Sequence, residues 1–261
     1  MVGQTSISDG VIYHKLAPLY DQIMRDVDYE DWTEYVDSII QYHHPGAITL
    51  LELACGTGTM ALMLEHCDHY KITGTDASES MIAQARKKAA RNKSGIRWLV
   101  QDMRRLDIDE RFDVVYMVFD SLNYLHDERE VDALLKSVAQ HLADGGIFLF
   151  DFTTPSHSTK ILPYLNNTRN ITPRHLMKRS SSYDAEQRLH YNHFSIIKKD
   201  RTGGKIQETF RETHIQKTWS FSEIKERIEE SPLRLLAAYE DFELDCATED
   251  SDRITMVVTH G

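Results

Sequence analysis

The sequence predicts an α/β fold: a doubly wound, seven-stranded and mostly parallel sheet with an antiparallel last strand, plus a small inserted antiparallel β lid. Five apolar runs alternate with helical patterns between residues 48 and 152, which is typical of a parallel sheet with helices on both faces. A glycine-rich turn follows the first of these runs. Residues 235–242 and 253–260 read as two closing strands. Their connection is too short for a crossover helix, so they should pair antiparallel.

The glycine-rich turn joins an apolar strand, residues 48–54, to a helix that starts near Met60. This order of strand, turn and helix points backbone N–H groups at a nucleotide-like ligand. Residues 56–61 match the Gly-x-Gly-x-x-Ala fingerprint of dinucleotide-binding folds. Glu52, an acid just inside the end of the strand, instead favours a turn built for S-adenosylmethionine (SAM). The turn alone leaves both cofactors open.

Acidic residues stand at the C-terminal ends of the next four predicted strands. These strands are residues 70–75, 96–101, 112–119 and 147–152, and the acids are Asp76, Asp102, Asp120 and Asp151. Ligands bind at this edge of a doubly wound sheet, so four acids in register predict a binding edge. Asp76 lies 18 residues past Gly58, and an acid near that spacing binds ribose hydroxyls.

The helices have recognisable ends. Ser78 is a predicted N-cap, and residues 220–223 have the spacing of a capping box that opens a helix through Glu230. The helix before residue 142 is expected to close at Gly145-Gly146. Residues 11–42 read as helices rich in aromatic side chains. These rings are either a stripe packed on the core or a flap over the cofactor, where an aromatic ring suits a positively charged sulfonium.

Residues 156–217 differ in character from the rest of the chain. Helical periodicity fades after Ser156, and alternating stretches at 187–197 and 205–219 flank a turn at 200–204, which predicts an antiparallel hairpin. This inserted lid carries 12 Lys and Arg against 5 Asp and Glu, a net charge of +7, which leaves −18 on the remainder. Attraction between lid and body is the favoured explanation, and an anionic substrate under the lid is the other.

Composition limits the functional classes. A net charge of −11 disfavours a nucleic-acid binder. Three unclustered cysteines indicate reduced thiols and a cytoplasmic location. The sequence shows neither a membrane-spanning apolar run nor a signal peptide, so no membrane partner is expected. The histidines lack the spacing of metal ligands, so no metal is expected. The chain should be a monomer or a homodimer.

Together these motifs resemble the Rossmann-like (class I) SAM-dependent methyltransferases, of the small-molecule type with an inserted β lid. Residues 52–58, Glu-Leu-Ala-Cys-Gly-Thr-Gly, are similar to the first motif of that family. Asp76 is similar to its ribose-binding acid, and residues 102–103 to its adenine-contacting pair. The likeness covers nearly the whole chain, with further family-like segments at residues 20–24, 120–125 and 212–219.

The resemblance implies a SAM-binding domain over residues 1–155 and 218–261, with an N-terminal helical flap at 11–42 and the lid at 156–217. It implies that Glu52 and the glycine loop hold the methionine end of SAM, Asp76 the ribose and Asp102 the adenine amino group. The implied cofactor contacts are Tyr20, Trp32, Glu52, Ala54, Gly56, Gly58, Asp76, Ala77, Met81, Asp102, Met103, Phe119 and Asp120.

The predicted activity is methyl transfer from SAM, which becomes S-adenosylhomocysteine, to a nitrogen or oxygen of a small molecule. Such a transfer depends mainly on positioning, and a base is needed only for a protonated acceptor. Strand alternation puts His214, the candidate base, on one lid face with two polar neighbours. The acceptor-side candidates are Asn123, Tyr124, Asp151, Glu212 and Gln216. An NAD(P)-dependent oxidoreductase and a non-catalytic SAM-binding protein are the alternatives.

Overall fold

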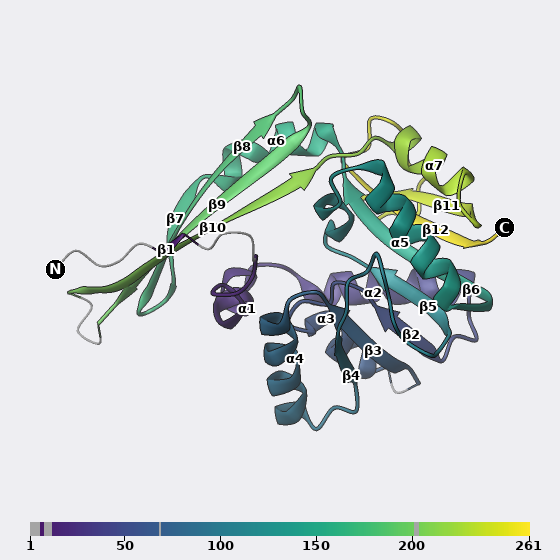
Figure 1. Cartoon of the computed structure of the whole chain (residues 1–261), viewed down its shortest axis with the longest axis horizontal. Coiled ribbons are helices and arrows are strands. Elements are labelled where there is room, and N and C mark those ends of the chain that lie inside the picture. Colours follow the sequence, from purple (N-terminus) through teal and green to yellow (C-terminus); the bar gives the residue numbers. More distant parts are fainter. Residues whose placement is uncertain (1–5, 8–11, 68, 201–203) are drawn as a thin grey trace.

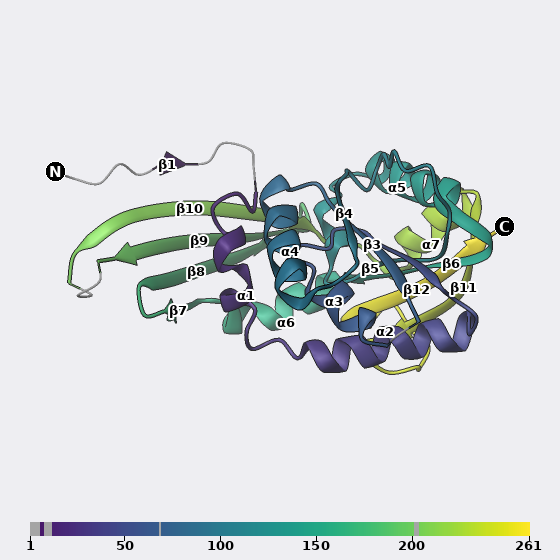
Figure 2. The ribbon, with the colours of Figure 1, turned by 90° about the horizontal axis from the view of Figure 1, so that it is seen from below.

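The computed structural model describes residues 6–7, 12–67, 69–200 and 204–261. These residues form a body around a seven-stranded sheet, with the order β11-β12-β6-β5-β2-β3-β4, and a second sheet that projects from one end of the body (Figure 1 and Figure 2). The strands of the body are β2 (Thr49–Glu52), β3 (Lys71–Asp76), β4 (Arg97–Val100), β5 (Phe112–Met117), β6 (Leu142–Thr153), β11 (Leu233–Glu240) and β12 (Arg253–His260).

Strand directions confirm the predicted fold class. β12 runs antiparallel to both of its neighbours, β6 and β11. The pairs among β2, β3, β4, β5 and β6 are parallel. The C-terminal ends of β2, β3, β4 and β5 therefore meet along one rim of the sheet, where ligands bind in doubly wound folds.

Helices cover both faces of the body sheet. They are α2 (Tyr29–His43), α3 (Thr59–Glu65), α4 (Glu79–Asn92), α5 (Glu128–His141) and α7 (Phe221–Glu229). One core cluster packs α2, α3 and α4 against the sheet, and another packs α5 and α7. Successive residues of β2 supply both clusters, Leu50 the first and Leu51 the second, and both are fully buried. Strands covered on two faces must be apolar on both, which explains the continuous apolar run.

Helix ends agree with the sequence in two cases and differ in one. The Ser78 hydroxyl caps α4 by accepting from the Met81 N–H, and Ser220 and Glu223 form the predicted capping box of α7. The prediction that Gly145-Gly146 closes α5 is wrong, because α5 ends at His141 and the glycines lie within β6. The pairing of β5 with β6 changes register there. A Cβ on Gly146 would lie 3.0 Å from three carbonyl oxygens, so that bend requires glycine.

The lid sheet has the strand order β1-β10-β9-β8-β7. Its strands are β1 (Ser6–Ile7), β7 (Asn167–Thr172), β8 (His175–Asp184), β9 (Leu189–Lys199) and β10 (Ile206–Lys217). β9 and β10 form the predicted antiparallel hairpin, although residues 201–203 of its turn lie outside the described residues. The short parallel pairing of β1 with β10 was not predicted.

Two helical segments differ from the sequence prediction. Residues 155–165, where helical periodicity was expected to fade, form α6 (Pro155–Leu165). Thr154 caps this helix, and Pro155 is its first residue. Ser158 is the one residue described in α6 that is buried, so the helix has little apolar periodicity. The helix expected from residue 11 starts later, as a short turn η1 (Ala17–Leu19) and α1 (Tyr20–Ile23). Residue 11 lies outside the described residues, and residues 12–16 form turns.

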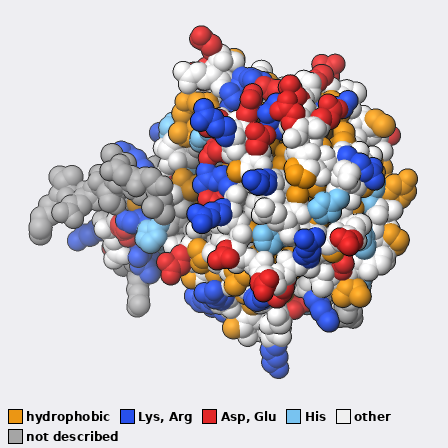
Figure 3. Space-filling view, turned by 45° about the vertical axis from the view of Figure 1, so that its right-hand side comes forward, with side chains coloured by type: hydrophobic (Ala, Val, Ile, Leu, Met, Phe, Trp, Pro, Cys, Tyr) orange, Lys and Arg blue, Asp and Glu red, His pale blue; other side chains and the backbone are white. Residues whose placement is uncertain are grey.

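The outer surface gives little indication of a site. On the face in Figure 3, acidic and basic side chains lie side by side, with hydrophobic side chains scattered among them. Large exposed hydrophobic residues stand on separate elements, such as Tyr42 on α2 and Tyr164 on α6, as is normal for a globular surface. A large cavity instead lies between the body and the lid sheet.

Candidate cofactor and acceptor site

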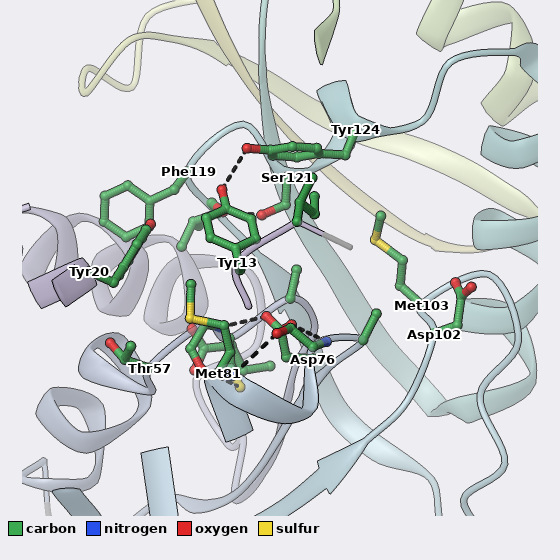
Figure 4. A pocket seen from close by; sticks show the side chains of 18 of the residues that line it. Tyr13, Tyr20, Thr57, Asp76, Met81, Asp102, Met103, Phe119, Ser121 and Tyr124 are labelled. Carbon is green, nitrogen blue, oxygen red and sulfur yellow. Dashed lines mark hydrogen bonds between the residues drawn. The ribbon is translucent and has the colours of Figure 1, made fainter. Parts of the chain in front are cut away.

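A cavity of about 870 Å³, here called the main cavity, lies between the rim of the body sheet, the N-terminal segment and strand β10. Figure 4 shows side chains from the rim of the body sheet and from the N-terminal segment around it. Twelve residues predicted for the site line this cavity. They are Tyr20, Glu52, Ala54, Gly56, Asp76, Ala77, Met81, Asp102, Met103, Phe119, Tyr124 and Glu212.

Asp76 and the glycine turn form one unit at the rim. One Asp76 carboxylate oxygen accepts from the Gly56 N–H at 2.8 Å, and the other accepts from the Ser78 N–H at 2.7 Å. Burial raises the pKa of Asp76, and the two backbone bonds partly offset that rise. Each oxygen keeps further acceptor capacity, which fits the paired hydroxyls of a ribose.

Glu52 is a buried carboxyl group at the base of the cavity. It is 3% exposed, and its Oε2 has no hydrogen-bond partner among the described residues. Burial raises its pKa to about 8, which favours the protonated form near neutral pH. A cationic group placed beside it would favour the carboxylate. This residue therefore fits a ligand with a positive charge, such as the ammonium or sulfonium group of SAM.

The two glycines of the turn have different roles. Gly56 and Gly58 both have positive φ, +54° and +74°. A Cβ on Gly58 would lie 2.3 Å from the Trp98 ring, so packing alone requires glycine there, and Gly58 is not in the cavity wall. Apart from its chain neighbours, a Cβ on Gly56 would approach only the Tyr20 ring among the described residues, at 4.0 Å. Gly56 thus keeps open a space that belongs to the cavity.

The four acids at the strand ends divide into two pairs. Asp76 and Asp102 line the main cavity. Asp120 and Asp151 do not, because the Arg253 guanidinium lies between them, 2.9 Å from Asp120 and hydrogen-bonded to Asp151. Burial raises the pKa of Asp151 to about 6, against the opposing effect of Arg253. The sequence pattern predicted all four acids, but it did not indicate Arg253 on β12, which pairs with two of them.

Asp102 is held by its neighbour Arg104. The Arg104 Nε lies 2.9 Å from one carboxylate oxygen and its NH2 lies 2.6 Å from the other. Hydrogen bonds from Arg104 hold the pKa of Asp102 below its ordinary value. Met103, from the same turn, and Met81, from α4, also line this part of the cavity. Their side chains provide apolar surface of the kind that flanks a flat ring.

Phe119 separates Trp32 from the cavity. The Trp32 ring packs 4.4 Å from Phe119 and 4.5 Å from Phe242, and Arg253 lies over it at 5.4 Å. Only Phe119 lines the cavity, with a positive φ of 63° that is strained for a bulky residue. Such strain occurs at functional sites when the surrounding structure enforces it.

Asn123 lies away from the main cavity and is occupied by backbone bonds. Its two amide hydrogens are donated to the carbonyls of Thr153 and Lys217, and its oxygen accepts from the Thr153 N–H. It is fully buried. Its role in the structure is to tie the end of β6 to the end of β10. Gln216 also lies outside the main cavity, where its amide donates to Asp120 at 2.6 Å.

A chain of hydrogen bonds connects His214 to the cavity. The Tyr124 hydroxyl lies 2.6 Å from the Tyr13 hydroxyl (Figure 4) and 3.0 Å from His214 Nδ1. His214 Nε2 lies 3.5 Å from the Glu212 carboxylate. His214 itself is 3% exposed and is not in the cavity wall, so it can reach a bound molecule only through Tyr124.

Glu212 also holds the N-terminal segment. Its carboxylate accepts from the backbone N–H groups of Tyr13, Lys15 and Leu16, at 2.8, 2.9 and 3.1 Å. This contact places Tyr13 at the cavity. Sequence analysis did not identify Tyr13 as a site residue, and only its position in the aromatic-rich segment could have indicated it.

Within 6–7, 12–67, 69–200 and 204–261, no three His, Cys, Asp or Glu side chains are grouped so that they could hold a metal ion. In the same part of the chain, none of the helices is long and apolar enough to span a membrane.

Known proteins are similar to this chain over most of its length. Residues 50–146 match a family model described as a methyltransferase domain. The chain is 29% identical over 236 residues to the putative methyltransferase YqeM of Bacillus subtilis (strain 168), which covers 89% of this chain and 90% of that protein. It is 31% identical over 144 residues, 52% of this chain and 56% of the relative, to the dTDP-3-amino-3,4,6-trideoxy-alpha-D-glucopyranose N,N-dimethyltransferase of Streptomyces venezuelae.

Structural similarity is more extensive than sequence similarity. The crystal structure of an S-adenosylmethionine-dependent methyltransferase from Clostridium acetobutylicum matches with a TM-score of 0.78 at 25% identity, over 95% of this chain and 99% of that one. These matches set aside the nicotinamide interpretation of residues 56–61. The chain contains a methyltransferase domain and has the fold of the class I SAM-dependent methyltransferases, and it is an enzyme whose cofactor is S-adenosylmethionine.

Proposed function

We propose that this enzyme transfers the methyl group of SAM to a nitrogen or oxygen of a small molecule bound under the lid. The supporting observation is the main cavity itself, which extends from the glycine turn to the hydroxyls of Tyr13 and Tyr124. Its volume of about 870 Å³ is that of a site for a cofactor and a small acceptor together. The Streptomyces venezuelae relative, by its name, methylates an amino sugar nitrogen, which is consistent with such an acceptor.

Cofactor binding is assigned to the side of the cavity nearest the glycine turn. Glu52 and Gly56 would hold the methionine end, Asp76 the ribose, and Asp102 the adenine, with the two methionines against the ring. When bound, SAM supplies a methyl group already activated by its positive sulfur. The part of the protein is then to exclude water and align the acceptor. Residues 1–155 and 218–261 form the proposed cofactor domain.

Acceptor binding is assigned to the other side, under the lid at residues 156–217. An acceptor that carries a proton would give it to the Tyr124 oxygen while the Tyr124 hydrogen passes to His214 Nδ1. Glu212 would orient the imidazole and stabilise the charge that it gains. Burial raises the pKa of Tyr124 well above its ordinary value, so Tyr124 acts as a neutral relay and not as a standing phenolate.

The test has two stages. Calorimetry with SAM and with NADH measures cofactor choice, and SAM binding without NADH binding is expected. Labelled methyl-SAM is then incubated with the enzyme and a metabolite extract, and the labelled product is identified by mass. A labelled small molecule with a new N-methyl or O-methyl group supports the proposal. Label found only in protein or nucleic acid would contradict it.

A further inference from the structure

A second and smaller cavity, of about 140 Å³, lies where α6 and strands β8, β9 and β10 meet the body. We call it the lid-root cavity. Most of its wall is polar and includes Asp120, Ser158, Arg179, His190, Asn192 and Gln216. Its volume corresponds to roughly four or five water molecules, which is enough for one carboxylate or phosphate group.

The lid-root cavity and the acceptor side of the main cavity are close together in the lid sheet. In the lid sheet, Arg179 lies opposite Phe194, and Phe194 lies opposite Glu212. Two residues further along β9, Asn192 lies opposite His214. Alternate residues of a strand point to the same face, so these side chains share the inner face of the lid. One rigid surface therefore carries both the proton path and the lid-root cavity.

Arg179 is a half-buried cation without an ion pair among the described residues. Its Nε and NH2 donate to the Asn192 side-chain oxygen at 3.1 and 2.7 Å, and its guanidinium lies 5.4 Å over the Phe194 ring. Among the described residues, no carboxylate lies within 4.0 Å of it. The acid in the wall, Asp120, is already bound to Arg253 and Gln216. The charge of Asp120 opposes the lowering of the Arg179 pKa by burial, but no direct ion pair forms, and a partly buried charge without one is costly.

His190 provides a second polar atom without a partner. The residue is 5% exposed, and its Nδ1 lies 3.0 Å from the Ser158 hydroxyl. Its Nε2 has no hydrogen-bond partner among the described residues. A neutral imidazole that accepts from Ser158 carries its hydrogen on Nε2, which is then an unused donor. Burial lowers the pKa of His190, which favours this neutral form.

We propose that the lid-root cavity binds a compact oxyanion of the methyl acceptor, a carboxylate or a phosphate, with Arg179 as its charged partner and His190 as a second donor. A guanidinium binds such groups through two parallel hydrogen bonds. Binding there would fix the acceptor beside Tyr124. The statement that the anion belongs to the acceptor rests on the proposed function, whereas the anion site itself does not.

Anion binding is tested first without any acceptor. Thermal unfolding of the full chain is followed in sodium phosphate and in sodium acetate, each matched in ionic strength with sodium chloride. At saturation, phosphate or acetate is expected to raise the Tm of the wild type by about 3 °C. Arg179→Gln should lose this rise. Arg174→Gln should keep it, because within the described part of the chain Arg174 also donates only to neutral oxygens, at the other end of the lid sheet.

Comparison of the Tm rises in the wild type and the two arginine variants decides whether the anion site exists. Equal rises in the wild type and in both arginine variants would show a general salt effect and overturn the site, as would no rise in the wild type. If Arg179→Gln does not fold, His190→Phe replaces it, and an undiminished rise in that variant overturns the site. The anion that gives the larger rise in the wild type identifies the class.

The acceptor assignment is tested with the labelled product. It should be retained on an anion-exchange column, and alkaline phosphatase should release it only if the anion is a phosphate. Arg179→Gln should raise the KM for this acceptor at least tenfold and leave the Kd for SAM unchanged. A product that contains neither a carboxylate nor a phosphate would overturn the inference but not the proposed function. No transfer of label by a SAM-binding wild type would count against the proposed function, while the phosphate result would still stand.

Discussion

The two walls of the main cavity are built differently. The wall proposed to bind the cofactor, here called the cofactor wall, comes from strand ends and turns between residues 52 and 103, backed by a continuous apolar core. The acceptor wall is made by Tyr13, Tyr124 and Glu212. Tyr13 is hydrogen-bonded to Tyr124, which is 111 positions away in the sequence, and to Glu212, which is 199 positions away. Local sequence therefore determines the first wall. The second exists only after the lid and the N-terminal segment have packed on the body.

The largest expected effect is on the cofactor wall, at Gly56. Gly56→Val should weaken SAM binding at least about 100-fold, because a β-branched side chain both strains a residue with positive φ and fills the space beside Tyr20. Calorimetry measures the affinity, and circular dichroism checks that the variant is folded.

The matched control for Gly56→Val is Gly46→Val. Beyond its chain neighbours, a Cβ on Gly46 would have no described residue within 4 Å, and this glycine does not have positive φ. Its SAM affinity should equal that of the wild type. Unchanged affinity in a folded Gly56→Val protein would mean that the glycine turn does not contact the cofactor.

Asp76 should show the next largest effect. Asp76→Ala is expected to weaken SAM binding by roughly 1.5–3 kcal/mol, the size of hydrogen bonds to a charged group. Asp113→Ala is the control, because the Asp113 carboxylate also accepts from two backbone N–H groups, those of Ile48 and Thr49, but at the start of β2. That variant should lose stability and keep its SAM affinity. Equal affinity losses in the two variants would place the effect of Asp76 in the fold and not in ligand binding.

The contrast between the walls also explains what the sequence could predict. The rim acids, the glycine turn and the strand alternation are short-range patterns, and they predicted the parallel sheet, its antiparallel finish and most of the cofactor wall. Asp120 and Asp151 were predicted as site residues on the same pattern. Their partner Arg253 lies 102 or more positions away, and no local pattern could reveal that pairing.

The acceptor wall was less predictable for the same reason. His214 and Glu212 were found as a polar alternation on one strand, but the alternation could not show that His214 lies behind Tyr124. Asn123 has an amide side chain that could bind an acceptor, but both of its N–H groups donate to the backbone carbonyls of Thr153 and Lys217. The α6 helix was missed because a surface helix that buries little apolar area leaves a weak periodic signal.

The proton path should show a smaller effect on activity and none on cofactor affinity. Tyr124→Phe and His214→Gln are each expected to lower kcat by about 10- to 100-fold for an acceptor that is protonated at the assay pH. The loss should shrink as the pH is raised, because the acceptor then loses its proton in solution. Steady-state kinetics across pH, with the acceptor found in the label screen, measures both features.

A double variant tests whether Tyr124 and His214 act in one proton path or make two independent contributions to activity. Tyr124→Phe combined with His214→Gln should be little worse than either change alone, since both interrupt the same route. His193→Gln is the control, because His193 is exposed on the neighbouring strand and binds Thr213. Multiplicative losses in the double variant would assign separate roles to the two residues.

The smallest expected effect concerns how Glu212 holds the acceptor wall together. Burial raises the pKa of Glu212, but its bonds to His214 and to three backbone N–H groups outweigh burial and leave the pKa below 4.5. A depressed pKa stabilises the fold above the unfolded value, and this stabilisation is lost as the pH falls through the folded value. Glu212→Gln should therefore lower the free energy of unfolding by about 1–2 kcal/mol at pH 7, and by progressively less below pH 4.5.

Urea unfolding at several pH values measures this difference, and Glu208→Gln on the same strand is its control. Glu208 is exposed and pairs with Lys15 at 3.4 Å, so its loss should change stability by less than about 0.5 kcal/mol at any pH. Protection of the Tyr13 and Leu16 amides from hydrogen exchange should fall in Glu212→Gln and not in Glu208→Gln. If both variants leave these amides protected, packing rather than the Glu212 carboxylate holds the N-terminal segment, and the acceptor wall is less dependent on long-range polar contacts than its geometry indicates.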